Sequence, residues 1–158
     1  MHAADVMTRT VVSVDPGLPV GEIAKLMLTR KVSAVPVVDG SGKLIGMVSE
    51  GDLMRRAELA TEKQRSWWLR LFVGDDYLAP EFVKSHGLRA RDVMTRDVVT
   101  VDESTPVVEI VNLIEEHRIK RVPVMRDGKM VGIVSRANLL HALASAADIE
   151  PARSAGSD

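Results

Sequence analysis

One segment of the sequence joins residue types that could bind a polar ligand. Gly46-Met47-Val48 is typical of a strand end, and Ser49 and Asp52 follow at the spacing of a helix start. Backbone N–H groups at a helix N-terminus favour negative charge, a serine hydroxyl can donate to a phosphate, and a carboxylate can accept from two vicinal ribose hydroxyls. The pattern predicts a polyol and anion site. It also fits an ordinary helix cap, with Ser49 as N-cap and Asp52 as its partner.

Other chemistry has little support in the residue pattern. The four histidines, His2, His86, His117 and His141, lack the spacing of metal ligands. The sequence contains no nucleophile elbow, Walker loop or Rossmann fingerprint. We therefore expect no catalytic residues, no metal site and no enzymatic activity.

The segment around Ser49 belongs to an internal repeat. The stretch from Asp5 to Asp15 returns from Asp92 onward, 87 residues later. Val-Pro-Val at residues 35–37 returns at 122–124, and Gly-Met-Val-Ser at 46–49 returns as Gly-Ile-Val-Ser at 132–135. Asn138 therefore takes the place of Asp52. Two copies at this period indicate a duplicated unit instead of a long repeat array.

Each copy predicts a β-α-β-β-α order: a Val-rich lead-in, a helix, two strands joined by a tight turn, and a closing helix. Thr105 and Pro106 suit the N-cap and first position of the second copy's helix. Apolar residues at helical spacing predict one buried stripe per helix. The stripes are Val20, Ile23, Met27 and Leu28 in the first copy, and Val107, Ile110, Val111 and Ile114 in the second.

The strands are predicted at 34–38 and 44–49, and at 121–125 and 130–135, with turn glycines that supply positive φ. The closing helices present Leu53 and Met54, or Leu139, Leu140 and Leu143. A unit of about 50 residues is too small to cover both faces of its sheet. We therefore expect an α/β (α+β) fold in which the two units pack with pseudo-twofold symmetry and form two clefts.

Taken in order and found twice, Asp-Val-Met-Thr, Val-Pro-Val and Gly-x-x-Ser-x-x-Asp resemble a tandem pair of cystathionine-β-synthase (CBS) domains, or Bateman module. The second copy departs from the last motif at Asn138. The resemblance covers residues 5–57 and 91–144. It implies a regulatory sensor that binds AMP, ADP, ATP or a related adenosyl ligand between the copies and signals occupancy to a partner. No cofactor is required, and AMP or ATP is the expected regulatory ligand.

The same resemblance assigns roles to individual residues. Asp52 would hold the ribose and Ser49 the phosphate, whereas Asn138 lacks the charge of a carboxylate, so we expect the Asp52 site to bind more tightly. In the first cleft the adenine would be framed by Thr10, Val11, Val12, Ala34, Val35 and Pro36. The second would use Val98, Val99, Arg121, Val122 and Pro123, with Ser135 and Arg136 near the phosphate.

A basic cluster spans residues 117–121, where the second copy's first helix passes into its strand. Cations at a helix C-terminus offset the macrodipole, which is one explanation. The other is that Lys120 and Arg121 meet the ligand's phosphates. The first copy has Ser33 and Ala34 at these places, so the two clefts would differ in charge.

The repeats divide the chain into a first CBS domain at 1–57, a helical insert or linker at 58–90, a second CBS domain at 91–147 and a flexible tail at 148–158. The insert carries Trp67 and Trp68. These tryptophans could seal the sheet or make a dimer or effector contact. An alternative function is therefore a ligand-independent interaction module that dimerises through this insert.

Composition narrows the class of protein further. The 158 residues carry a net charge of −1, contain no cysteine and are 46% hydrophobic, with few aromatics. We expect a cytoplasmic protein with an aliphatic core, no membrane span and no general nucleic-acid surface. A nucleic-acid role would need the 117–121 cluster exposed. We also expect a homodimer, and an effector protein or a further C-terminal domain as partner.

Overall fold

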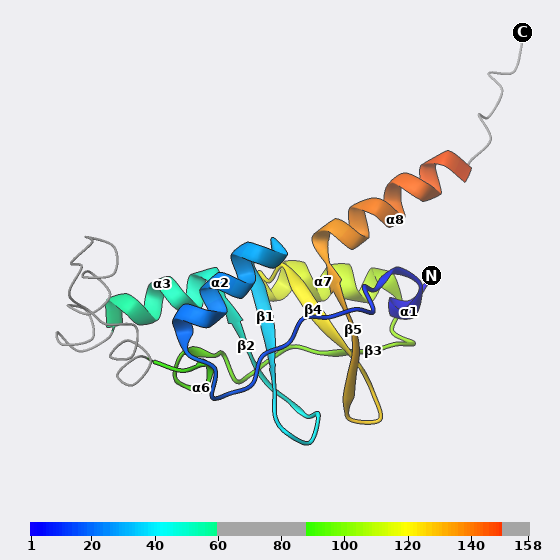
Figure 1. The fold of residues 1–158 in the computed structure, drawn as a ribbon. Coiled ribbons are helices and arrows are strands. Elements are labelled where there is room, and N and C mark those ends of the chain that lie inside the picture. The colour runs from blue at the N-terminus through cyan, green and yellow to red at the C-terminus, as the bar shows by residue number, and fades with distance from the viewer. Residues whose placement is uncertain (60–87, 150–158) are drawn as a thin grey trace, which may run out of the picture. The chain divides into compact units, whose positions relative to one another are not determined.

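The computed structural model describes residues 1–59 and 88–149 and shows a mixed α+β fold (Figure 1). The chain divides into two compact units. Of the described residues, unit 1 contains 1–11 and 99–149, and unit 2 contains 12–59 and 88–98. The predicted fold class is confirmed, because each unit combines helices with a small sheet.

Unit 2 is built around the hairpin of the first repeat. Strands β1 (Ala34–Val38) and β2 (Leu44–Ser49) pair antiparallel, and Val14 pairs in parallel with Val37. On the far edge of β2, Met47 pairs antiparallel with Thr95. The helices are α2 (Val20–Arg30), α3 (Glu50–Leu59) and the short α6 (Ala90–Val93).

Unit 1 repeats this plan around the hairpin of the second repeat. Strand β3 (Val101–Asp102) is parallel to β4 (Arg121–Arg126), which is antiparallel to β5 (Lys129–Ser135). Thr8 pairs antiparallel with Ile133 on the outer edge of β5. The helices are the short α1 (Ala3–Val6), α7 (Val107–His117) and α8 (Arg136–Ile149).

The compact units do not follow the sequence repeats at their beginnings. The segment that opens the first repeat packs in unit 1, and the segment that opens the second repeat packs in unit 2. We name residues 1–9 the N-terminal lead-in and residues 88–96 the internal lead-in. Each sheet is thus completed by the lead-in of the other repeat. The boundaries at 57, 91 and 147 describe the repeats in sequence and remain a prediction.

Both described cores are aliphatic. In unit 2 the buried residues come from Val14, α2, both strands, Leu53 and the internal lead-in. In unit 1 they come from the N-terminal lead-in, β3, α7, β4 and β5. Burying the methyl-rich faces of Ile23, Ile110 and Ile114 supplies the hydrophobic stabilisation that each small sheet needs from its helix.

Several sequence predictions differ from the structure in detail. Pro106 is the N-cap of α7, so the helix begins one residue later than predicted, while Thr105 Oγ1 accepts from the Asp102 N–H at 3.1 Å. Leu28 is 81% exposed and Val111 is 40% exposed, because each lies at the edge of its stripe where the sheet no longer covers it. Three apolar residues of the closing helices are also exposed: Met54, Leu140 and Leu143.

The hairpin turns use the predicted glycines selectively. Gly42 has φ of 87°, and Asp127 and Gly128 have φ of 51° and 76°, so these residues supply the left-handed conformation that tight turns require. Asp39 Oδ1 accepts from the Ser41 hydroxyl and from the Ser41 and Lys43 N–H groups. The hydrogen bond from the Ser41 hydroxyl, and next the one from the Lys43 N–H, lower the pKa of Asp39 below its usual value, because they stabilise the ionised carboxylate.

The predictions for residues 60–87 lie outside the described residues. They include Trp67 and Trp68 and the helices expected in the insert. All five aromatic side chains of the chain lie in this range. Helix α8 continues through Ile149, two residues into the segment predicted as tail, and the rest of that segment is also outside the described residues.

A close backbone approach explains one glycine in each repeat. A Cβ added at Gly46 would lie 2.6 Å from Met94 Sδ and 2.9 Å from the Thr95 carbonyl oxygen. The equivalent Gly132 stands in the same relation to Met7 Sδ, at 2.5 Å, and to the Thr8 carbonyl oxygen, at 2.9 Å. Each lead-in therefore lies directly on its hairpin with its methionine packed over a glycine.

We predict that Gly46→Ala lowers the free energy of unfolding by about 1–3 kcal/mol, because the new methyl group displaces the internal lead-in. Gly40→Ala is the matched control, since nothing lies within 4 Å of its Cβ position. Urea unfolding followed by circular dichroism measures both. A Gly46→Ala protein as stable as the control would contradict the close approach.

Candidate functional site

In unit 2 the closing helix α3 begins directly after Ser49, and its first N–H groups need acceptors. The Asp52 N–H donates to Ser49 Oγ at 3.1 Å, and the Ser49 N–H donates to Asp52 Oδ2 at 3.0 Å. The Ser49 hydroxyl also donates to Asp52 Oδ2, at 3.0 Å. Ser49 and Asp52 thus form a reciprocal helix cap, one of the two interpretations of this segment.

Asp52 has a further partner from the second repeat. Thr95 and Met47 exchange two backbone hydrogen bonds, of 2.8 and 3.0 Å, and this pairing carries Thr95 to the start of α3. The Thr95 hydroxyl donates to Asp52 Oδ1 at 3.0 Å. Asp52 is 7% exposed and is the one buried charged residue among those described. Its hydrogen bonds offset the cost of burying a carboxylate.

Unit 1 contains the same arrangement with an amide in place of the carboxylate. The Ser135 N–H and hydroxyl both donate to Asn138 Oδ1 at 2.8 Å, and the Asn138 N–H donates to Ser135 Oγ at 3.3 Å. Since Oδ1 faces Ser135, Nδ2 faces Thr8 and donates to Thr8 Oγ1 at 3.1 Å. The threonine hydroxyl therefore donates to Asp52 in unit 2 but accepts from Asn138 in unit 1.

The predicted adenine-framing residues of β1 lie beside this cap. Ala34 pairs with Ser49 in the hairpin register, and the Glu50 N–H donates to the Ser33 carbonyl oxygen at 2.9 Å. Val35 and Pro36 are fully buried, so their side chains fill the core of unit 2. Only Ala34 of the three retains an accessible side chain, and it is half-buried.

In unit 1 the residues that match Ser33, Ala34 and Glu50 are basic. Arg121 pairs with Ser135 in the hairpin register, and the Arg136 N–H donates to the Lys120 carbonyl oxygen at 3.0 Å. Lys120 and Arg136 are exposed and Arg121 is half-buried. Val122 is buried in the core, as is Pro123. Three basic residues therefore stand next to the cap of unit 1 along the chain or in the hairpin register, where unit 2 has Ser33, Ala34 and Glu50.

The remaining predicted ligand residues stand where the chain passes from one unit to the other. Thr10 and Val11 belong to unit 1, and Val12 belongs to unit 2. Val98 belongs to unit 2 and Val99 to unit 1. The structure places each of them with its own unit, and their role in a shared cleft remains a prediction.

The comparison with protein families decides what kind of chain this is. The sequence model of the CBS domain matches residues 3–58 and 90–145. The chain belongs to the CBS domain family. It is a CBS pair, because the two matches follow each other along the chain.

Relatives of this CBS pair include the chloroplastic CBS domain-containing protein CBSX2 of Arabidopsis thaliana. It is 30% identical over 137 residues, which are 82% of this chain and 57% of CBSX2, so the chain spans little more than half of that relative. A crystal structure of CBSX2 in complex with AMP has a TM-score of 0.71 and 27% identity, and the match covers 92% of this chain and 98% of that one. An inosine-5'-monophosphate dehydrogenase of Methanocaldococcus jannaschii is 28% identical over 139 residues, 87% of this chain but 23% of the enzyme.

Sequence reasoning missed Thr8 and Thr95 as members of the two caps of the CBS pair. Both residues are in the Asp-Val-Met-Thr motif, whose repetition was the clue that organised the sequence. The repetition was a usable signal, since a threonine that follows the same buried methionine in both copies points to the same hydrogen-bonding role in both. What the sequence does not reveal is that each threonine meets the hairpin of the other repeat.

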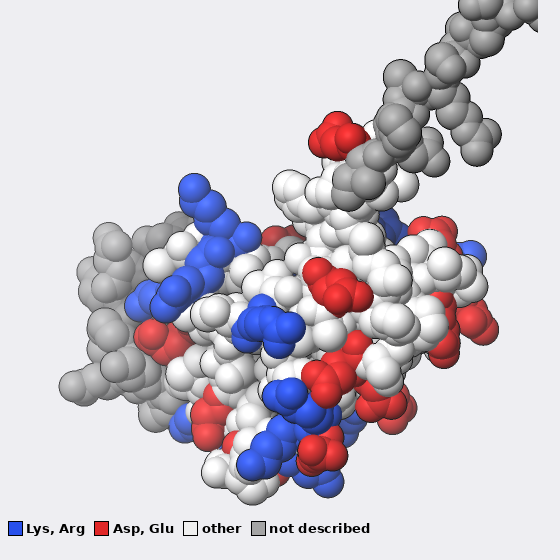
Figure 2. Space-filling view, turned by 90° about the vertical axis from the view of Figure 1, so that its right-hand side faces the viewer, with Lys and Arg blue, Asp and Glu red and all other residues white. Residues whose placement is uncertain are grey.

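The surface of the CBS pair is mixed in charge on the face that Figure 2 shows. Lys and Arg side chains lie there among Asp and Glu side chains and uncharged surface, without forming one continuous basic area. The basic cluster at 117–121 begins at the last residue of α7, and Arg118 is the left-handed C-cap of this helix.

No described group of three or more His, Asp and Glu residues could hold a metal ion, and no described helix is long and apolar enough to cross a bilayer.

We predict that Asp52→Ala destabilises the protein by about 2–3 kcal/mol, because it removes both the helix cap and the acceptor of the Thr95 hydroxyl. Asn138→Ala is the matched change in unit 1 and costs about 1–2 kcal/mol, because the bond that it loses to Thr8 is between neutral groups. Chemical denaturation of both variants measures the difference. Equal losses would contradict the charge-assisted role of Asp52.

Proposed function

We propose that this CBS pair is a regulatory sensor of adenine nucleotides, with AMP or ATP as ligand, and that it acts on a partner without catalysis. In this proposal Asp52 accepts hydrogen bonds from the ribose hydroxyls, and Ser49 lies near the phosphate. The observation that carries the proposal is the fixed Asp52 carboxylate at the start of α3. The relative CBSX2, whose crystal structure is described as a complex with AMP, supports the choice of ligand.

The geometry of the cap supports a role for Asp52 in ligand binding. Its bonds to Ser49 and Thr95 fix one side-chain conformation before any ligand arrives. A preorganised acceptor loses less conformational entropy on binding than a mobile one. A carboxylate also accepts hydroxyl hydrogen bonds about twice as strongly as a neutral amide does. We therefore place the tighter site at Asp52 and the weaker one at Asn138.

The residues beside the two caps differ in charge, which supports a difference in ligand affinity between the two sites. Unit 2 carries Glu50 and Asp52 at its cap and offers acceptors, which suit ribose hydroxyls. Unit 1 carries Lys120, Arg121 and Arg136 around its cap, and these cations suit phosphate oxygens. The unequal charge supports unequal affinity of the two sites for the same nucleotide.

We also propose that the protein acts in the cytoplasm as a homodimer that passes ligand occupancy to an effector protein or to a further C-terminal domain. Exposed apolar residues in unit 1 support the dimer. Val108 and Val111 on α7 and Leu140 and Leu143 on α8 are large side chains open to solvent. Apolar surface of this kind is stabilised when a second protein covers it.

The nucleotide proposal is tested by thermal shift and calorimetry with AMP, ADP and ATP. A ligand at about 100 times its Kd stabilises the folded state by about 2.7 kcal/mol and raises Tm. We expect Asp52→Ala to abolish most of this ligand-induced rise, and Asn138→Ala to retain most of it. Each variant is compared with itself without ligand, because both changes also weaken a helix cap.

A 2'-deoxy analogue of AMP is the chemical control, since it lacks one of the hydroxyls assigned to Asp52. It should bind the native protein more weakly than AMP and bind Asp52→Ala no differently. If none of the three nucleotides raises Tm or releases heat on titration, the sensor proposal fails.

The dimer proposal predicts that replacing Leu140 and Leu143 together by Glu converts the protein to a monomer. Charged side chains cannot be buried in an apolar interface without a large desolvation cost. His141→Glu, at an exposed position of the same helix, is the control and should leave the dimer intact. Sedimentation velocity measures the state of each variant, and a native protein that sediments as a monomer refutes the proposal.

A further inference from the structure

The two lead-ins make the same set of backbone hydrogen bonds, each within its own unit. Three bonds tie the start of each lead-in to the loop before the first helix, and a two-bond pair ties its threonine to the hairpin. In unit 1 these are Ala3 to Thr105, Ala4 to Glu103, Val107 to Met1 and the Thr8–Ile133 pair, and in unit 2 they are Ala90 to Leu18, Arg91 to Pro16, Val20 to Leu88 and the Thr95–Met47 pair. The backbone therefore does not distinguish the two lead-ins.

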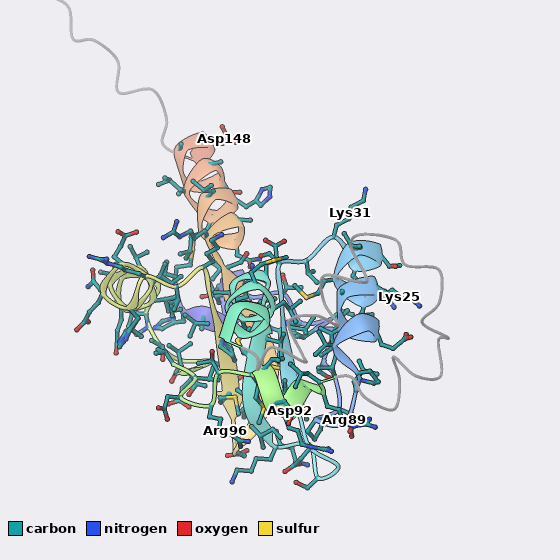
Figure 3. The ribbon with its side chains drawn as sticks, turned by 90° about the vertical axis from the view of Figure 1, so that its left-hand side faces the viewer. Lys25, Lys31, Arg89, Asp92, Arg96 and Asp148 are labelled. Atoms are coloured by element: carbon teal, nitrogen blue, oxygen red, sulfur yellow. The ribbon has the colours of Figure 1, made fainter. Side chains whose placement is uncertain are left out.

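Their side chains do distinguish them. Arg89 lies at the start of α6, beside Asp92, and its Nη1 donates to the Gly17 carbonyl oxygen at 2.7 Å (Figure 3). In the N-terminal lead-in His2 takes this place, and its Nδ1 lies 3.8 Å from Asp5 of the same lead-in. The guanidinium thus fastens the internal lead-in to the loop before α2, whereas the described contact of the imidazole stays within its own segment.

The second difference is the bond between threonine and cap. Thr95 donates to a buried carboxylate, whereas Thr8 accepts from a neutral, partly exposed amide. Charge-assisted bonds are roughly twice as strong as neutral ones. The third difference is the burial of the lead-in methionine, since Met94 of the internal lead-in is 3% exposed and Met7 of the N-terminal lead-in is 9% exposed. All three differences favour tighter attachment of the internal lead-in.

We propose that Thr95 is a positioning residue that joins the Asp52 cap to the internal lead-in, and that the N-terminal lead-in is the more weakly held of the two and opens first. Its opening frees the backbone groups of Ile133 on the edge of β5 and removes the hydroxyl that Asn138 bonds. Unit 1 would then keep its Ser135–Asn138 cap but lose the bond between this cap and Thr8, while unit 2 keeps both its cap and the Thr95 bond. This inference goes beyond nucleotide binding and requires no ligand.

Native-state hydrogen exchange followed by NMR tests it in the ligand-free chain. The amides of Thr8 and Ile133 should exchange at least about tenfold faster than those of Thr95 and Met47, because each pair reports the opening of one lead-in. Equal rates, or slower exchange of Thr8 and Ile133, would overturn the proposal.

Swapping the distinguishing side chains between the units tests whether these side chains, and not the position of each lead-in along the chain, set the amide exchange rates. Asp52→Asn with Arg89→His gives unit 2 the side chains of unit 1 and should speed exchange at Thr95 and Met47 about tenfold. Asn138→Asp with His2→Arg makes the opposite change and should slow exchange at Thr8 and Ile133 by a similar factor. If both double variants keep the native rates, the side chains do not set the strength of attachment.

The role of Thr95 is tested by a conservative pair. Thr95→Val removes the hydroxyl at constant shape and should speed exchange at Met47, while Thr95→Ser keeps a hydroxyl and should restore most of the protection. Thr8→Val is the control in unit 1 and should have the smaller effect. A Thr95→Val protein that exchanges like Thr95→Ser would show that the hydroxyl positions nothing. Should the protein bind no nucleotide, the sensor proposal would fail and these rates would still decide this one.

Discussion

The start of each closing helix is the point on which the rest of the structure depends. The first N–H groups of the helix have no intrahelical acceptors. The N-cap serine accepts from the N–H of the residue three places later, and the side chain of that residue accepts from the serine N–H. In unit 2 the same residue, Asp52, accepts a hydrogen bond from a lead-in that belongs to the other repeat. One carboxylate therefore stabilises a helix end and holds an edge segment of the sheet.

Close packing makes this arrangement possible. Thr95 reaches Asp52 only because Met94 lies over Gly46, where any Cβ would meet the methionine sulfur and the next carbonyl oxygen. The glycine, the methionine and the threonine thus act together to bring the lead-in to the cap, and each unit contains one such set. The two repeats carry one copy of this arrangement each, and the copies differ chemically because residue 138 is an asparagine where the first repeat has Asp52.

Much of the fold could be predicted from the sequence, because its signals are local. The periodicity of apolar residues identifies the helices and the core positions Ile23, Ile110 and Ile114, and the turn glycines locate the hairpins. The exchange of lead-ins could not be predicted. Both lead-ins carry Asp-Val-Met-Thr-Arg, so either one satisfies either hairpin in local terms, and only the path of the whole chain selects the pairing. The exposure of Leu28 and Val111 was missed because periodicity defines a stripe but not how far the sheet covers it.

The capping and ligand-binding interpretations of Ser49 and Asp52 began as alternatives, and the geometry makes them compatible. A cap by itself needs one carboxylate oxygen, and Asp52 uses Oδ2 for Ser49 and Oδ1 for Thr95. A ribose hydroxyl that bonds Asp52 would therefore meet an acceptor whose partners include a helix terminus and a lead-in. Binding at such a residue alters the balance of those bonds, because a hydroxyl that approaches Oδ1 competes with Thr95 or draws on the same charge. The shared hydrogen bonds of Asp52 are then the physical reason why a ligand bound to this side chain would affect the internal lead-in, whose Thr95 lies 43 positions along the chain.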